Sequence, residues 1–231
     1  MKKLLEKNLS FLDQVPFMHG GVFDNKKIYE NTLVAYNSAI KNNIGIKTDI
    51  RLTLDHQLIC FADENEMRML HTEDKVNDDT YENIIYIAKY PILKLHDVLE
   101  IVDGKTPLLF EVFGIYKSSY YENSIMEELA NYKGPYAIES NDLGLVKWFY
   151  KNHKDVVIGY KVDKVNDHKF HFFYNYDFID IDVELSKDKD IRKGRECSFI
   201  LGHNVFNDFE YENKITVYNN LVCETKLEND L

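Results

Sequence analysis

The chain has 231 residues, a length that suits one domain and is too short for two domains of about 150 residues each. Hydrophobic residues make up 45% and aromatic residues 13% of the chain, which excludes a disordered or low-complexity protein. The net charge is −11 and the basic residues are scattered, which argues against general nucleic-acid binding. We therefore expect a single domain over residues 1–231, with small molecules, cations or proteins as partners.

The cysteines and the N-terminus bear on the compartment. Cys60, Cys197 and Cys223 lie in short apolar runs without metal-binding spacing, so we expect buried, reduced thiols and a reducing compartment. The opening residues MKKLLEKNLS are too polar for a secretory signal, and no run approaches the roughly 20 apolar residues of a membrane span. The sequence thus predicts a cytoplasmic protein without a membrane span and leaves its oligomeric state open.

Short apolar runs alternate with segments of helical periodicity along the whole chain. The first half predicts strands at 15–19, 44–53, 58–62 and 107–113, and helices at 30–43 and 95–102. The helix 30–43 places Leu33, Tyr36, Ala39 and Ile40 on one face. The second half predicts helices at 124–132 and 143–152, and strands at 136–140, 156–162, 178–183, 197–201 and 215–224.

This alternation is typical of an α/β fold with a parallel sheet. About eight strands in one domain favour a (β/α)8 barrel, with an open doubly wound sheet as the alternative. The chain contains neither G-x-G-x-x-G nor G-x-x-x-x-G-K-[ST], the glycine signatures of many doubly wound folds. The stretch 172–197 leaves little room for long helices, so we expect a helix of the C-terminal half to be short or missing.

The predicted strand IGIKTDIRLT carries three charges on one face. Side chains alternate along a strand, so Lys47, Asp49 and Arg51 point one way while the isoleucines point the other. A strand of a helix-covered parallel sheet is usually apolar on both faces, and an unpaired buried charge is costly. These groups therefore pair with each other, bind an ion or face a wet cavity, unless the strand lies at a solvated edge.

Three more polar residues stand near strand ends. Glu111 interrupts PLLFEVF, Asp63 follows LICFA and His19 ends VPFMH. In a barrel these side chains and Asp49 converge on the C-terminal mouth, where functional groups gather. Carboxylates with a histidine can bind a hard cation or transfer protons. The alternatives are a structural histidine and, for Asp63, a cap or turn residue.

The order of these motifs resembles the glycerophosphodiester phosphodiesterase family. The segments HGG (19–21), YENTLVAYNSAI (29–40) and IGIKTDIRLTLDHQLICFADENEMRM (44–69) resemble its H-R-G, P-E-N-T and G-x-x-x-E-x-D motifs. The likeness continues through LKLHDVLEIVDGKTPLLFEVF (93–113) and returns at LVCET (221–225). It implies a (β/α)8 barrel that hydrolyses glycerophosphodiesters to an alcohol and glycerol phosphate. The family's site has two catalytic histidines, an arginine for the phosphate, and Ca²⁺ or Mg²⁺ held by three carboxylates.

The resemblance carries over only part of this site. His19 matches the first catalytic histidine, and Asp49 and Glu111 match two of the metal carboxylates. The matching supporting positions are Glu30, Asn31, Asp63 and Arg68.

The departures from the family pattern fall on the chemistry itself. Ala62 stands at the second catalytic histidine and Lys47 at the first metal carboxylate. Gly20 replaces the phosphate-binding arginine, and Phe113 replaces a lysine. We expect the Lys47 ammonium to take the place of the metal and to bridge Asp49 and Glu111; a plain salt-bridge network is the alternative.

Ala62 cannot transfer a proton, so a second acid or base has to come from elsewhere. His71 and His203 are candidates, His203 the better one because it follows a late strand. His56 falls in the predicted turn 54–57 and is expected to face away from the mouth.

Three functions stay open. The first is a pseudoenzyme that needs no cofactor and binds a small polar, anionic or phosphorylated molecule through Lys47, Glu30, Asp63, Arg68 and His203. The second is an active phosphodiesterase with a rearranged site that uses His19 and Ca²⁺ or Mg²⁺. The third is a non-catalytic scaffold for protein interaction.

Overall fold

The strands close into a barrel. The computed structural model describes residues 7–64, 66–114, 119–163, 176–185 and 187–224. Within these residues, eight parallel strands pair in the order β1-β9-β8-β7-β6-β5-β4-β2, and β1 pairs with β2 to close the ring. The predicted (β/α)8 barrel is confirmed, and the open doubly wound sheet is wrong. The barrel strands are β1 (Phe17–His19), β2 (Gly45–Leu52), β4 (Leu108–Glu111), β5 (Tyr136–Ser140), β6 (Val157–Val162), β7 (Phe178–Asp182), β8 (Phe199–Val205) and β9 (Asn220–Cys223).

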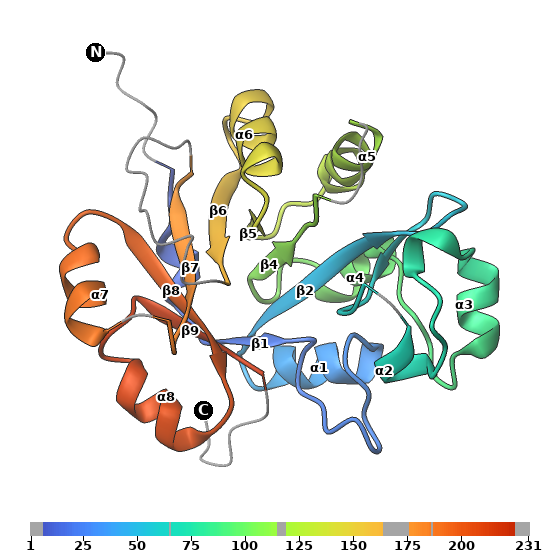
Figure 1. The fold of residues 1–231 in the computed structure, drawn as a ribbon, viewed down its shortest axis with the longest axis horizontal. Coiled ribbons are helices and arrows are strands. Elements are labelled where there is room, and N and C mark those ends of the chain that lie inside the picture. The colour runs from blue at the N-terminus through green and yellow to red at the C-terminus, as the bar shows by residue number, and fades with distance from the viewer. Residues whose placement is uncertain (1–6, 65, 115–118, 164–175, 186, 225–231) are drawn as a thin grey trace.

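The helices lie outside the ring of strands (Figure 1). The predicted helices 95–102 and 143–152 are confirmed to the residue, whereas the first helix begins only at Leu33. It buries Ala35, Tyr36 and Ala39, whereas Leu33, at the start of the predicted apolar face, is 46% exposed. The helices are α1 (Leu33–Lys41), α2 (Met67–Leu70), α3 (Tyr81–Ile87), α4 (Leu95–Val102), α5 (Tyr120–Leu129), α6 (Leu143–Asn152), α7 (Asp188–Gly194) and α8 (Asp208–Lys214), with 3-10 turns η1 (Ser10–Leu12) and η2 (Val76–Asp78).

The strand β3 (Leu58–Cys60) is not part of the barrel. It pairs antiparallel with β2, with Leu58 opposite Leu52 and Cys60 opposite Ile50. The end of β2 and the strand β3 therefore form an antiparallel hairpin that extends beyond the ring of barrel strands. The return brings Phe61 level with Asp49, whose carbonyl accepts a hydrogen bond from the Phe61 amide at 3.1 Å. The following residues thus reach the mouth from a hairpin rather than from the end of a parallel strand.

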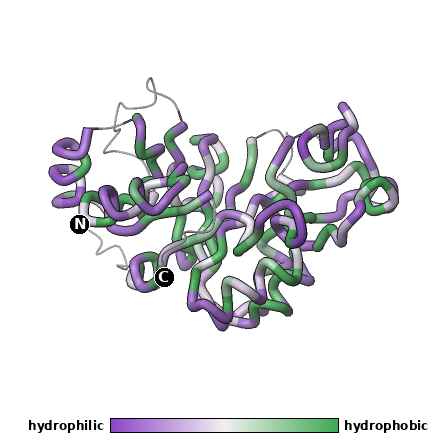
Figure 2. Tube along the Cα trace, turned by 90° about the horizontal axis from the view of Figure 1, so that it is seen from below, coloured by the Kyte–Doolittle hydropathy of each residue, from purple (hydrophilic) through white to green (hydrophobic). Residues whose placement is uncertain are grey.

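The C-terminal half has short helices, as the sequence predicts. Helices α7 and α8 have seven residues each. The prediction of a missing helix also concerns the connection between β6 and β7, and residues 164–175 of that connection lie outside the described residues. In Figure 2, many residues of the outer helices are hydrophilic, and many residues of the central strands are hydrophobic.

The barrel interior has an apolar bottom. Leu12 of η1 is fully buried and closes the N-terminal end, and the Asn220 side-chain amide donates to the Leu12 carbonyl at 2.8 Å. The residues packed in this layer are Leu12, Phe17, Leu109, Ala137, Val157, Phe178, Leu201 and Val222. The next inward-pointing side chain of each strand comes two residues later and lies one layer nearer the C-terminal end of the barrel. The polar groups of the site start in that next layer, above the apolar one.

Two expectations about the surface can be compared with the fold. Cys60 and Cys223 are buried, but Cys197 is exposed because it lies in the turn after α7, before β8 begins. Over the described ranges, no helix has the length and apolar character needed to cross a bilayer. The cytoplasmic location stays a prediction.

Candidate functional site

A cavity of about 600 Å³ opens at the C-terminal ends of the barrel strands. The four residues predicted to converge there, His19, Asp49, Asp63 and Glu111, all line it, so that prediction is confirmed. The remaining lining residues are Gly20, Phe23, Asn25, Glu30, Asn31, Ala62, Arg68, Phe113, Asn141, Lys161, Asp163, Phe206 and Glu224. We call this space the mouth cavity.

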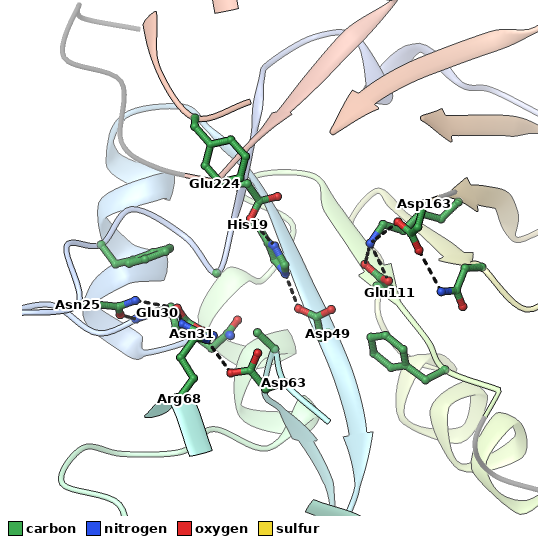
Figure 3. Close-up of a pocket in the computed structure, with 17 residues that line it drawn as sticks. His19, Asn25, Glu30, Asn31, Asp49, Asp63, Arg68, Glu111, Asp163 and Glu224 are labelled. Carbon is green, nitrogen blue, oxygen red and sulfur yellow. Dashed lines mark hydrogen bonds and ion pairs between the residues drawn. The ribbon is translucent and has the colours of Figure 1, made fainter. Parts of the chain in front are cut away.

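His19 is held between two carboxylates (Figure 3). Its Nε2 atom contacts Asp49, and its Nδ1 atom lies 2.9 Å from Glu224 Oε2. Burial alone would lower the pKa of His19, but Asp49 and Glu224 outweigh that effect and raise the pKa to about 10. The imidazolium is therefore the form that this arrangement stabilises, with both ring nitrogens donating.

We expect His19 to make the free energy of unfolding fall as the pH rises into the alkaline range. A raised histidine pKa stabilises the fold fully below the ordinary pKa of 6.5, and the contribution is lost as pH rises towards about 10. The His19 imidazole should titrate near pH 10 in an NMR titration, with its signal assigned by its loss in His19→Gln. A midpoint near 6.5 would contradict the paired arrangement.

On one side of the mouth cavity, Arg68 joins Glu30 and Asp63 (Figure 3). Its Nη1 and Nη2 atoms donate to the two Glu30 oxygens at 2.9 and 2.5 Å, and its Nε atom donates to Asp63 at 2.7 Å. The Asn25 side-chain amide also donates to Glu30, at 2.8 Å. Three of the predicted supporting residues, Glu30, Asp63 and Arg68, thus form one cluster, in which two carboxylates bind the guanidinium.

The backbone at Glu30 and Asn31 is fixed by a buried hydrogen-bond triangle. The Asn31 side-chain oxygen accepts from the Tyr36 hydroxyl and from the Thr48 hydroxyl, both at 2.9 Å. Asn31 has a φ of 55°, a left-handed conformation that asparagine tolerates better than most residues. This explains why the predicted helix start at residue 30 gives way to a turn that presents Glu30 to the mouth cavity.

Gly20 stands where the family pattern has an arginine, and its backbone suits glycine. Its φ is 74°, and a Cβ atom there would lie 2.9 Å from the Glu30 Cβ. Any side chain at this position would be strained and would push against the turn that carries Glu30. In this backbone, an arginine at position 20 cannot be restored without a shift of residues 20–31.

Beneath the mouth cavity lies a buried cluster of charges around Lys47. The Lys47 Nζ atom lies 2.7 Å from Glu139, 3.2 Å from Glu111 and 3.5 Å from Asp180, and Lys47 is 1% exposed. The predicted contact with Glu111 is confirmed. The predicted bridge to Asp49 is wrong, because Asp49 stands one inward position nearer the mouth and pairs with His19 instead. Lys47 is not among the residues that line the mouth cavity, and its predicted role as a ligand contact stays a prediction.

The carboxyl groups around Lys47 differ in their protonation. Burial opposes ionisation of Glu111, but Lys47 and Lys161 lower its pKa to about 2. Burial raises the pKa of Glu139 to about 8, since the attraction of Lys47 is offset by repulsion from Asp180 and Glu111. The cluster therefore balances its charges internally near neutral pH, with Glu139 as the carboxyl that takes up a proton most readily.

Lys161 connects the buried cluster to the mouth cavity. Its Nζ atom donates to both oxygens of Glu111 at 2.9 Å and lies 3.3 Å from Asp163. His203 lies deeper: it is 1% exposed, 3.0 Å from Asp180 and 3.2 Å from Asp163. His203 is absent from the lining of the mouth cavity, and its predicted contact with a ligand stays a prediction.

The two further histidines considered from the sequence, His71 and His56, do not line the mouth cavity either. His71 lines a separate cavity with Tyr29 and Tyr90. His56, as predicted, faces away and packs edge-on against the Tyr120 ring at 4.8 Å between centroids.

Arg51, the third charge of the predicted strand, is a structural clamp. It donates to the carbonyls of Phe61 and Ala62 at 3.3 and 2.6 Å, and its guanidinium lies 3.5 Å from the centroid of the Phe113 ring. It thereby holds the returning hairpin and the ring at the wall of the mouth cavity.

Sequence reasoning missed several functional residues. Glu139, Lys161 and Asp180 are charges inside apolar strands, the same signal that singled out Lys47 and Glu111. Applied to YAIES, VIGYKV and FIDID, that signal would have found them. Glu224 directly follows β9 and could have been found by the rule for strand ends.

Solved structures share the fold over nearly the whole chain. A glycerophosphodiester phosphodiesterase from Thermotoga maritima is 21% identical, with a TM-score of 0.74 over 90% of this chain and 94% of that one. An Oleispira antarctica phosphodiesterase in complex with the product sn-glycerol-3-phosphate is 12% identical, with a TM-score of 0.76 over 90% and 92% of the chains. An enzyme from Parabacteroides distasonis is 12% identical, with a TM-score of 0.73 over 92% and 93%. At these identities the likeness shows the fold alone.

The sequence comparison is more specific. A search of curated proteins finds no match. Residues 19–142, just over half of the chain, match the model of the glycerophosphoryl diester phosphodiesterase family. This range begins at His19 and spans Lys47, Asp49, Ala62 and Glu111. With the barrel and the position of its mouth cavity, the match shows that the chain belongs to the glycerophosphoryl diester phosphodiesterase family.

Proposed function

We propose that this barrel is a member of the family that does not hydrolyse glycerophosphodiesters efficiently and uses its mouth cavity to bind a small polar molecule. The observation that carries the proposal is the buried Lys47 ammonium, 3.2 Å from Glu111. A cation of the protein itself thus neutralises a carboxylate that the family pattern assigns to a metal.

The donor set supports this proposal. Glu111 is bound by Lys47 and by Lys161, and Asp49 is bound by His19. Ca²⁺ takes six to eight oxygen ligands, and Mg²⁺ requires nearly octahedral oxygen coordination. In the described part of the chain, no three His, Cys, Asp or Glu side chains are arranged so that they could hold a metal ion. The residues present do not fit the family's metal, because Asp49 and Glu111 could bind a metal ion only by giving up the cationic side chains with which they pair.

Proton transfer lacks its second partner. Ala62 lines the mouth cavity at the position of the second family histidine and has no titratable group. His203 is buried between Asp163 and Asp180, and His71 faces another cavity. A positioned acid or base typically contributes about 10²–10⁴-fold to a rate. His19 favours the remaining alternative, a weak phosphodiesterase with one acid–base group, because it lines the cavity.

We expect no turnover of glycerophosphocholine or glycerophosphoethanolamine above the rate of the His19→Ala variant. The result should be the same with EDTA and with about 5 mM Ca²⁺ or Mg²⁺, which exceeds the Kd of roughly 10⁻⁴–10⁻³ M of weak protein Ca²⁺ sites. Release of glycerol 3-phosphate, measured with a coupled dehydrogenase, checks this. His19→Ala is the matched control because it removes the last acid–base group of the family pattern. Hydrolysis by the wild-type chain that disappears in His19→Ala would overturn the proposal in favour of the active alternative.

A further inference from the structure

The charges around the mouth cavity do not balance. Its lining holds six carboxylates, from Glu30, Asp49, Asp63, Glu111, Asp163 and Glu224, against the cationic side chains of Arg68, Lys161 and His19. Lys47 lies below and is shared among carboxylates of the buried cluster. An anionic ligand would thus enter a cavity whose walls are acidic, which Coulomb repulsion disfavours.

Most of the hydrogen-bond donors of these cationic side chains already point at carboxylates. Arg68 donates to Glu30 and Asp63, as described above. The Lys161 ammonium donates to both Glu111 oxygens, and both His19 nitrogens contact carboxylates. A phosphate has only acceptors, so it would have to compete with these carboxylates for most of the donors.

The acceptors, in contrast, are in excess. An ionised carboxylate offers about four lone-pair sites. The six carboxylates of the lining share its three cationic side chains, Lys47 and His203 from beneath, and the amides of Asn25 and Asn141, which together leave acceptor sites over. A ligand that brings N–H donors and positive charge can use the remaining sites without displacing an ion pair. The phenyl rings of Phe23, Phe113 and Phe206 also line the cavity and suit the aliphatic part of such a ligand or its ammonium.

We propose that the mouth cavity binds a small organic amine in preference to a phosphate ester. This inference rests on the proposed function, because it assigns the ligand class of the same non-hydrolytic cavity. The carboxylates of the cavity lining accept hydrogen bonds from the ammonium groups of the ligand, and the phenyl rings cover its carbon chain.

The test compares three probes by titration calorimetry at low ionic strength. The first is 1,4-diaminobutane; butane-1,4-diol is its uncharged counterpart, and glycerol 3-phosphate, present in the complex of the Oleispira antarctica relative, is the anionic reference. We expect saturable binding of the diamine, with the diol about tenfold weaker or more, and glycerol 3-phosphate weaker still. Glycerol 3-phosphate binding as tightly as the diamine would overturn the proposal, as would absence of diamine binding up to about 10 mM, the upper end of useful affinities.

A variant tests the carboxylates directly. Asp63→Asn keeps the side-chain volume, removes one charge and weakens the pairing with the Arg68 Nε donor. We expect diamine affinity to fall about tenfold and glycerol 3-phosphate affinity to rise. Asp163→Asn should also weaken the diamine, and it serves if Asp63→Asn fails to fold. Glu100→Gln, on the exposed face of α4, is the matched control and should leave binding unchanged. No loss of diamine binding in either folded variant would contradict the assignment.

The two proposals fail in different ways. Turnover of a glycerophosphodiester overturns the proposed function whatever the amine does. Binding of glycerol 3-phosphate in preference to the diamine, without turnover, overturns only the ligand class.

Discussion

Lys47→Met lowers the free energy of unfolding at pH 7 by about 3–5 kcal/mol, the range seen when one partner of a buried ion pair is removed. Methionine fits the space of the lysine stem but leaves Glu111, Glu139 and Asp180 close together without the ammonium that binds all three. The loss therefore comes from uncompensated buried charge rather than from a void. Urea unfolding followed by circular dichroism measures it.

The defect should depend on pH. In the wild-type chain, cationic neighbours keep the pKa of Glu111 at about 2, so its stabilising contribution is present above the ordinary value of 4.5 and lost as pH falls towards 2. Lys47→Met lacks the part of this contribution that comes from Lys47, while Lys161 stays on Glu111. The difference between the two proteins should therefore shrink as pH falls through that window.

The exposed Lys105→Met is the matched control for this experiment, since the Lys105 side chain is half exposed and lies 3.8 Å from Asp103. Surface ion pairs of this kind contribute about 0–1 kcal/mol. A loss in Lys47→Met no larger than in Lys105→Met would show that the buried cluster does not depend on its ammonium.

Lys47→Glu, the reversion towards the family pattern, should make stability depend on a divalent cation. The substitution changes the charge of the buried cluster by two units and places a fourth carboxylate beside Glu111, Glu139 and Asp180. Without a cation we expect a larger loss of stability than in Lys47→Met. Binding of Ca²⁺ at about a hundredfold excess over its Kd returns about 2.7 kcal/mol, or about 5–11 °C in melting temperature for a domain of this size.

Thermal unfolding with CaCl₂ and with EDTA checks this prediction. The wild-type chain and Lys105→Glu, a change of equal charge on the surface, should melt at the same temperature in both. An equal rise in the wild-type chain would mean that the effect of Ca²⁺ does not depend on the residue at position 47. No rise in Lys47→Glu would mean that the cluster cannot form a cation site even without the ammonium.

Much of the fold is readable from local pattern. The helices 95–102 and 143–152 and the strand 136–140 are predicted to the residue, because each combines a clear hydrophobic period with clear end signals. The direction of β3 is not readable in the same way. A short apolar run pairs parallel or antiparallel according to the turn before it, and here residues 54–57 reverse the chain at once.

The site, like the fold, could be predicted only in part from local sequence pattern. The alternation of side chains places Lys47 and Asp49 on the inner face of β2, and the fold confirms it. Which carboxylate each of them meets depends on the stagger of neighbouring strands around the barrel. That stagger puts Lys47 at the level of Glu139 and Asp180, on β5 and β7, and puts Asp49 at the level of His19. Such pairings between distant strands are a property of the closed ring, not of any one segment.

The buried cluster around Lys47 constrains how such a sequence can change over generations. Its members neutralise one another, so the effect of replacing any one depends on which residues occupy the other positions. A route from this barrel to a metal-dependent relative, or in the other direction, passes through less stable single replacements unless two positions change together or spare stability is available beforehand. Coordinated exchange at Lys47 and Glu139 is therefore the pattern to look for among natural variants of this chain.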